Sequence, residues 1–237
     1  MLPYVLRFNF MDIRLFLGLS LLVMQATLAV VYVRELYAVR RSIGTSAGAQ
    51  SVAVLSELMW VVAATGWVWY GVWSHSAVLV ASGSIGVIGS ATVAWLVFNT
   101  LSQYQRRRYL LITAVFAVAM ILSAVVWGLG GLGTFLAVFG LVQFLPQMHL
   151  SATQLLRGEI VHSVPIKGAA LRALYTGLWA IYAVAWHLWG TDPVPIDWPL
   201  AVWGLAGCIA FSLQVFVGLS SRRMLQRSFV LPEKSAV

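Results

Sequence analysis

The chain has 237 residues, of which 61% are hydrophobic and only 9% are charged. Soluble domains carry about 25% charged residues, so this composition excludes an ordinary water-soluble globular protein. The formal net charge is +8, but the basic residues stand in short clusters at the ends of apolar stretches, which argues against nucleic acid as a partner and is typical of membrane proteins. Cys208 is the only cysteine, which excludes an intramolecular disulfide and a cysteine-based metal site.

Seven apolar stretches are long enough for membrane-spanning helices, which need roughly 20 residues each. The first follows Arg7 and Arg14, and it is too long for a signal peptide and lacks a clear cleavage site, so we interpret it as a retained span. Met1 and Met11 are both compatible with the true start. The predicted spans cover residues 15–37, 52–73, 77–104, 109–129, 132–155, 167–189 and 197–221. The glycine-rich residues 128–133 predict a tight hairpin between the fourth and fifth spans.

The basic residues predict how these spans are oriented. Nearly all of the basic residues fall at one end of the predicted spans. The opposite end of the spans carries a neutral loop around His75, the glycine hairpin and the acidic stretch that ends at Asp197. The positive-inside rule then places the N-terminus outside and the C-terminus in the cytoplasm, in a plasma membrane. Thirteen of the 15 Lys and Arg residues fall on the cytoplasmic side: Arg34, Arg40, Arg41, Arg106, Arg107, Arg108, Arg157, Lys167, Arg172, Arg222, Arg223, Arg227 and Lys234.

Residues 30–70 recur at residues 142–182 with a constant offset of 112 positions. Trp67-x-x-Tyr70 matches Trp179-x-x-Tyr182 in this register, and an offset of 115 pairs Gly89 with Gly204 and Asn99 with Gln214. We therefore predict an all-α membrane protein in which two parallel three-helix repeats are joined by a linker helix. The first repeat is expected in residues 1–108, the linker in 109–130, and the second repeat with a cytoplasmic tail in 131–237.

Two short motifs resemble those of a known family. Phe144-Leu-Pro-Gln-Met148 is similar to the Pro-Gln signature of the PQ-loop family, and Trp67-x-x-Tyr70-Gly71 is similar to its W-x-x-Y-G pattern. The first repeat has Arg34-Glu35 where the second has Pro-Gln. The resemblance implies the three-one-three helix layout of SWEET-type and lysosomal PQ-loop transporters, with the N-terminus outside. The same layout also resembles that of the KDEL-type receptors.

Pro146 and Gln147 form the centre of the Pro-Gln motif. A proline inside a span removes a helix hydrogen bond and produces a kink, which predicts either a gating hinge or a static bend near the cytoplasmic end of span 5. Gln143 and Gln147 flank the proline and are expected either to line a pathway or to hydrogen-bond to neighbouring helices.

Ionisable residues inside spans are costly and are candidates for a substrate or proton pathway. Glu57 and Arg172 lie at comparable depths in spans 2 and 6, so we expect either an ion pair between them or a coupling role for Glu57. Further pathway candidates are Glu35, His149, Asn99 and Gln214.

These features predict a carrier that moves a small polar solute, such as a sugar or an amino-acid-like molecule, by alternating access between the two repeats. The alternatives are a non-transporting receptor or assembly subunit and, with no recognisable motif to support it, a membrane enzyme. No catalytic residue, metal site or cofactor is expected. The expected partners are the lipid bilayer and the solute, and the sequence leaves a homo-oligomer open.

Overall fold

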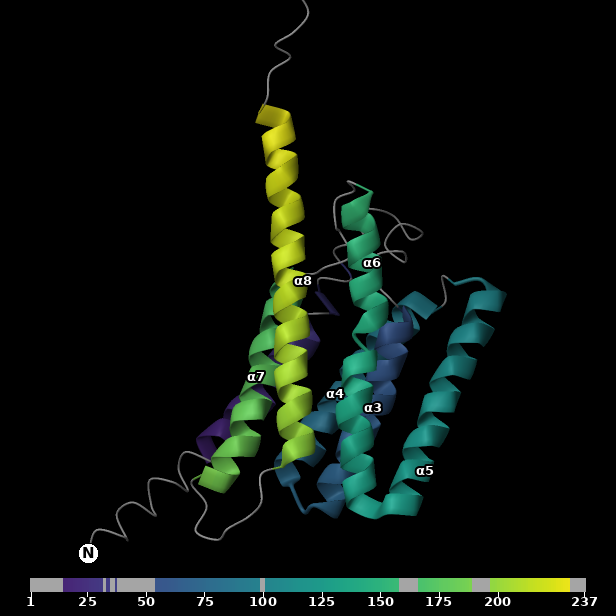
Figure 1. The fold of residues 1–237 in the computed structure, drawn as a ribbon, viewed down its shortest axis with the longest axis vertical. Coiled ribbons are helices and arrows are strands. Elements are labelled where there is room, and N and C mark those ends of the chain that lie inside the picture. The colour runs from purple at the N-terminus through teal and green to yellow at the C-terminus, as the bar shows by residue number, and fades with distance from the viewer. Residues whose placement is uncertain are drawn as a thin grey trace, which may run out of the picture.

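The computed structural model describes residues 15–31, 33–34, 37, 54–98, 101–157, 166–188 and 197–230. Within these ranges the chain is all-helical and contains no strand, so the predicted all-α class is confirmed for the described part. The helices are the N-terminal helical segment Leu15–Val31, α3 (Val54–Trp73), α4 (Ala77–Phe98), α5 (Gln103–Val142), α6 (Leu145–Leu156), α7 (Ile166–Leu188) and α8 (Trp198–Val230) (Figure 1).

Among the described residues, three helices are long and apolar enough to cross a membrane. They are Ala77–Leu96 within α4, Gln103–Val142, and Trp198–Ser221 within α8. The outer surface of α5 is correspondingly apolar, since Leu111, Val125 and Trp127 are all exposed. Leaving such a side chain in water rather than in an apolar environment costs about 1.5–3 kcal/mol, so these surfaces fit membrane association.

The 40-residue helix α5 reverses direction at Gly128. Gly128 has φ of 65°, outside the helical region, and the two halves of α5 run in opposite directions on either side of it (Figure 1). The hydroxyl of Ser123 donates to the carbonyl of Gly131 at 2.8 Å, whereas eight residues of straight helix would separate them by about 12 Å. A Cβ at Gly131 would lie 2.6 Å from the Ser123 carbonyl oxygen. The predicted glycine hairpin is therefore confirmed.

Glycines allow two pairs of helices to pack closely. Helix α3 packs along α4, and α7 packs along α8. In the first pair, a Cβ at Gly83 would lie 3.2 Å from the carbonyl oxygen of Ala64. In the second pair, a Cβ at Gly204 would lie 2.6 Å from the backbone nitrogen of Ala180. Small residues at these crossings bring the backbones together, which is a common form of packing between membrane helices.

The second half of α5 lies between the two pairs. A Cβ at Gly66 of α3 would meet the side chain of Leu136, and a Cβ at Gly140 would meet the ring of Trp203 on α8. Leu136 and Trp203 are both buried in the main hydrophobic core. The two halves of α5 thus differ in their packing, because the second half, after Gly128, fills the space between α3 and α8.

The helix ends gather at two opposite ends of the bundle (Figure 1). The first, the hairpin end, holds the turn between α3 and α4, the reversal in α5 and the start of α8. The second, the basic end, holds the start of α5 with Arg106, Arg107 and Arg108, the end of α6 with Arg157, and the end of α8. Segments expected on opposite sides of a membrane therefore lie at opposite ends of the molecule.

Several helix boundaries differ from the predicted spans. Helix α5 begins at Gln103 rather than at residue 109, because Ser102 and Gln105 form a capping box that starts the helix. Helix α8 continues past residue 221 to Val230. The arginines in that stretch end an apolar span but are good helix formers. The predicted span 132–155 is interrupted at residues 143–144, and Pro146 is the second residue of the new helix α6. Proline is well tolerated in a first helical turn.

Candidate functional site

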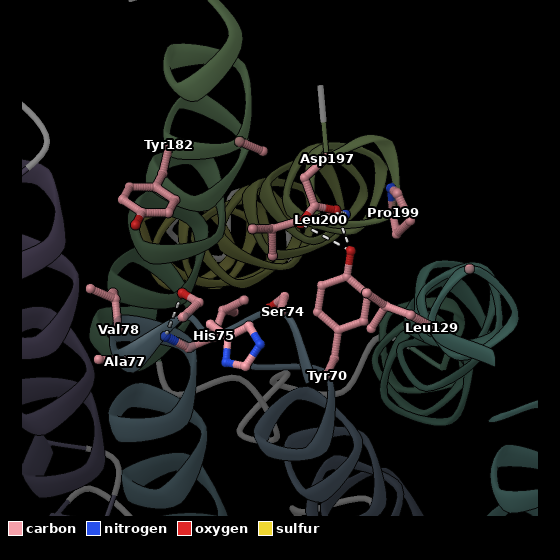
Figure 2. Close-up of a pocket in the computed structure, with 14 residues that line it drawn as sticks. Tyr70, Ser74, His75, Ala77, Val78, Leu129, Tyr182, Asp197, Pro199 and Leu200 are labelled. Carbon is pink, nitrogen blue, oxygen red and sulfur yellow. Dashed lines mark hydrogen bonds between the residues drawn. The ribbon is translucent and has the colours of Figure 1, made fainter. Parts of the chain in front are cut away.

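The hairpin end contains a cavity of about 670 Å³, which we call the Tyr70–Asp197 pocket (Figure 2). The α3–α4 turn, the reversal in α5, the end of α7 and the start of α8 surround it. Its volume falls within the range of about 300–1,000 Å³ that is typical of small-molecule sites. The described lining residues are Tyr70, Ser74, His75, Ser76, Ala77, Val78, Leu79, Leu129, Gly130, Tyr182, Ala183, Asp197, Pro199 and Leu200.

Asp197 joins two elements of this pocket. The hydroxyl of Tyr70 donates to its carboxylate at 3.1 Å from each oxygen (Figure 2), and the backbone N–H of Leu200 donates to Oδ1 at 3.2 Å. The second bond is an N-cap, which explains why α8 begins at Trp198. Burial raises the pKa of the Asp197 carboxyl above its ordinary value of 3.8, while the hydrogen bonds from Leu200 and Tyr70 oppose that change. The carboxylate is therefore held in an environment that disfavours its charge.

The turn between α3 and α4 supplies His75 and Ser76 to the pocket. The backbone N–H of Ser76 donates to the carbonyl of Gly71 at 2.8 Å, which closes the end of α3. His75 has φ of 56°, a value uncommon for a residue with a side chain, and this conformation lets the chain turn directly into α4. The Ser76 hydroxyl then accepts from the N–H of Leu79 at 3.4 Å and caps α4.

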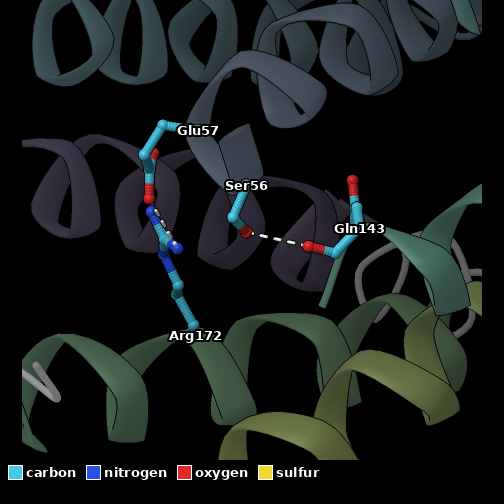
Figure 3. A network of polar contacts seen from close by, with 4 residues as sticks. All are labelled: Ser56, Glu57, Gln143 and Arg172. Carbon is cyan, nitrogen blue, oxygen red and sulfur yellow. Dashed lines mark hydrogen bonds and ion pairs between the residues drawn. The ribbon is translucent and has the colours of Figure 1, made fainter. Parts of the chain in front are cut away.

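A second polar group lies nearer the basic end. Arg172 Nη1 of α7 is 3.5 Å from Glu57 Oε1 of α3, and the two side chains are only 12% and 3% exposed (Figure 3). The predicted ion pair is thus confirmed. The guanidinium carbon also lies 5.4 Å from the ring centroid of Trp60 and 5.5 Å from that of Phe211. The Arg172 charge is therefore held by one carboxylate and by two aromatic faces.

Ser56 adds a second link at the same level. Its hydroxyl donates to the backbone carbonyl of Gln143 at 2.8 Å, at the break between α5 and α6 (Figure 3). The Gln143 side chain is fully buried, and its amide has no hydrogen-bond partner among the described residues. At the break before Pro146, the backbone carbonyl of Gln143 therefore accepts a hydrogen bond from α3. The buried side-chain amide of Gln143 has no hydrogen-bond partner among the described residues.

An aromatic layer separates the pocket from the ion pair. Its ring centroids are 5.0 to 6.2 Å apart in the contacts that connect them. The indole nitrogens of Trp67 and Trp203 are buried without a hydrogen-bond partner in the described part of the chain. The layer comprises Trp60, Trp67, Phe144, Trp203 and Phe211.

The remaining predicted site residues do not gather at one place. Gln214 is buried on α8, whereas His149 is exposed on α6. Pro146 and Gln147 lie in the first turn of α6. Glu35 and Asn99 lie outside the described residues. Within the described ranges, no three His, Cys, Asp or Glu side chains are grouped so that they could hold a metal ion.

Tyr70, Tyr182 and Asp197 were not among the predicted site residues. The tyrosines were recognised only as part of the repeated W-x-x-Y motif, and the acidic stretch was used only to predict orientation. One signal was present, because Asp197 is followed at once by Trp198-Pro199, a typical N-cap followed by a proline in the first helical turn. An aspartate at an N-cap is held in place at the N-terminus of its helix by a hydrogen bond to the backbone.

The two helix pairs carry matching aromatic contacts. The rings of Trp67 and Tyr70 are 5.5 Å apart at 80°, and those of Trp179 and Tyr182 are 5.4 Å apart at 80°. Both pairs have the edge-to-face geometry that aromatic rings prefer. These residues follow the predicted offset of 112 positions.

The second helices of the pairs match at a different offset. Gly83 lies against the Ala64 oxygen, and Gly204 lies against the Thr176 oxygen, which is the equivalent atom 112 positions on. Gly83 and Gly204 are 121 positions apart, as are the capping residues Ser76 and Asp197. Gly89 contacts Ala29 instead. The contacts of these glycines therefore fit an offset of 121 positions better than the predicted offset of 115, which paired Gly89 with Gly204.

Comparisons with known proteins do not identify the chain. No family model matches it, and no curated protein matches it. The pocket and the ion pair are therefore the features of the described chain that bear on its function.

Proposed function

We propose that this chain is a membrane carrier that moves a small polar solute by alternating access. In this proposal the N-terminal helical segment, α3 and α4 form one three-helix repeat, and the second half of α5 with α6, α7 and α8 forms the other. The first half of α5 is the linker, which gives seven membrane spans. The hairpin end faces outward and the basic end faces the cytoplasm of a plasma membrane, as the positive-inside rule requires.

The observation that carries this proposal is the paired lining of the Tyr70–Asp197 pocket. Tyr70 and Tyr182 are equivalent residues of the two helix pairs. Ser76 with Asp197, and Leu79 with Leu200, are equivalent at the helix starts. A cavity lined by equivalent residues is what a pathway between two repeats would require. In carriers built from parallel repeats, the solute pathway runs between the repeats.

Polar contacts cross the bundle nearer the basic end. Glu57 and Arg172 bridge α3 and α7, and Ser56 joins α3 to the α5–α6 break. These contacts and the aromatic layer lie between the pocket and the basic end. The arrangement therefore supports an outward-facing state in which the Glu57–Arg172 pair acts as an inner gate. Alternation to an inward-facing state requires this pair to separate.

Membership of the PQ-loop and SWEET-type family is part of the proposal. It rests on Phe144-Leu-Pro-Gln-Met148 and on the two W-x-x-Y motifs. The break between α5 and α6, at residues 143–144, overlaps the start of the Pro-Gln motif, which supports a gating hinge there.

Uptake by the purified protein in liposomes tests the proposal. A panel of labelled small polar solutes is first screened for uptake above that of empty liposomes. The pocket is then blocked through Ser74→Cys in a Cys208→Ser background, because Ser74 is exposed and lines the cavity. Coupling the introduced thiol to a bulky maleimide should stop uptake.

The matched control is Tyr104→Cys in the same background, since Tyr104 is exposed at the basic end. Its modification should leave uptake unchanged. Unimpaired uptake after complete labelling at position 74 would remove the pocket from the pathway.

The alternative is a non-transporting receptor or assembly subunit. The observation that favours it is the first half of α5, which lies at the edge of the bundle and exposes apolar residues such as Leu111 and Val125 (Figure 1). Lipid covers such a face equally well, so this surface supports the carrier no less. Failure to transport any solute, together with stable capture of a membrane partner along α5, would favour the alternative.

A further inference from the structure

We propose that the Tyr70–Asp197 pocket binds a small organic cation, with the carboxylate of Asp197 as its counter-ion. This inference deepens the proposed function by naming the chemical class of the solute, and it rests on that function for the claim that the bound cation is transported. Binding itself can be tested independently of transport.

The charged groups of the pocket favour a positively charged ligand. Among the described lining residues, Asp197 is the only acidic side chain and His75 is the only basic one. The ion pair found in the described part of the chain is the one between Glu57 and Arg172, so Asp197 has no cationic partner there. Its hydrogen bonds come from a neutral phenol and a backbone amide. A carboxylate in such surroundings is costly unless a positive charge accompanies it, and a cationic ligand supplies that charge.

The aromatic residues of the pocket also favour an ammonium group. Tyr70 and Tyr182 lie on different sides of the cavity (Figure 2). The hydroxyl of Tyr70 is directed to Asp197, so its ring forms the wall next to the carboxylate. Aromatic faces attract ammonium groups by about 0.5–2 kcal/mol each, and aromatic cages are a common way to bind quaternary ammonium ions.

The apolar part of the lining distinguishes an organic from an inorganic cation. Val78, Leu129 and Leu200 contribute surface that matches alkyl groups. Hard metal cations prefer six or more oxygen ligands, whereas a single carboxylate with a few hydroxyl groups offers fewer. The cavity of about 670 Å³ is also far larger than one such ion needs. An ammonium group that carries alkyl substituents satisfies the carboxylate, the rings and the aliphatic wall together.

Equilibrium binding of choline and of its neutral isostere 3,3-dimethyl-1-butanol tests the inference. Both are titrated by calorimetry into the purified full-length protein, at constant ionic strength. Choline should bind at least about tenfold more tightly than the isostere, a difference of about 1.4 kcal/mol. Equal affinity for the two compounds in the wild-type protein would overturn the inference. Sodium binding as tightly as choline would also overturn it, because it would indicate an inorganic cation site.

Asp197→Asn is the matched variant. Asparagine is as good an N-cap as aspartate, so α8 keeps its start while the charge is removed. Choline affinity should fall to that of the isostere in the variant, and Tyr104→Ala, at the exposed basic end, should leave both affinities unchanged. Retained choline preference in folded Asp197→Asn would overturn the role of the carboxylate. If the variant does not fold, the wild-type comparison of choline with its isostere still decides.

The binding experiment and the uptake experiment can fail independently of each other. Choline binding by a protein that transports no solute would support the cation site and overturn the carrier. Uptake of neutral solutes through the pocket, without preference for choline, would support the carrier and overturn the cation site.

Discussion

The hydroxyl of Tyr70 lies 3.1 Å from both carboxylate oxygens of Asp197, a residue 127 positions further along the chain. This contact ties the last turn of α3 to the first residues of α8 at the hairpin end. The Glu57–Arg172 ion pair joins α3 to α7 nearer the basic end. The same two helix pairs are therefore bridged by polar contacts both at the hairpin end and nearer the basic end, with an aromatic layer between them.

The stability of the protein should depend on the ionisation of Asp197. Burial raises the pKa of this carboxyl above 3.8, so the folded state holds the proton more tightly than the unfolded state. The wild-type protein should therefore lose stability relative to Asp197→Asn as the pH rises from 3.8 through the raised pKa. Thermal unfolding of both proteins in detergent across the acid and neutral range measures this difference. The opposite slope would mean that the hydrogen bonds to the ionised form outweigh its burial.

Glu57→Gln should lower the free energy of unfolding by about 3 kcal/mol, because it removes the carboxylate that lies 3.5 Å from a largely buried guanidinium. Adding Arg172→Gln should recover part of that loss, since the double variant removes the buried guanidinium as well. A double-mutant cycle of denaturant unfolding gives the coupling energy. Unchanged stability in Glu57→Gln, with loss of any pH dependence of uptake, would instead assign Glu57 to proton coupling.

Gly204→Ala should destabilise the protein by about 1–3 kcal/mol, because overpacking forces backbone shifts. The added Cβ would lie 2.6 Å from the backbone nitrogen of Ala180, which cannot rotate away. Gly130→Ala is the control, since nothing lies within 4 Å of its Cβ position. Unfolding midpoints of the two variants provide the comparison. Equal, small effects would show that α7 and α8 separate at little cost.

Pro146→Ala should slow transport while leaving solute affinity within a few fold. Alanine supplies the N–H that proline lacks, which lets α5 and α6 approach one continuous helix and stiffens the break at residues 143–144. Counterflow rate and equilibrium affinity are measured in the same purified protein once a solute is known. A normal counterflow rate in the variant would contradict the hinge and would leave Pro146 as a residue of a static helix start.

Reporter fusions test the predicted orientation. A fusion after residue 108, at the start of α5, should report the cytoplasm, and a fusion after residue 192 should report the exterior. Reports from the same side at both positions would contradict the proposed topology.

Part of the candidate site could be predicted from the sequence. The Glu57–Arg172 pair was expected because both residues stand at similar depths in apolar spans, where an unpaired charge is costly. The Tyr70–Asp197 contact was not expected, because its residues are far apart in sequence and each has an ordinary local role. The offset of 121 positions was also missed, since only the contacts of Gly83 and Gly204 show which glycine faces which helix.

The sequence by itself determined the all-helical class, the apolar stretches and the reversal at Gly128. These are local properties, set by hydropathy and by the conformational freedom of glycine. Only the tertiary structure decided which faces meet, and so where the pocket and the aromatic layer lie. The physical reason is that lipid is as apolar as a protein core, so hydropathy does not distinguish a side chain that faces lipid from one that faces another helix.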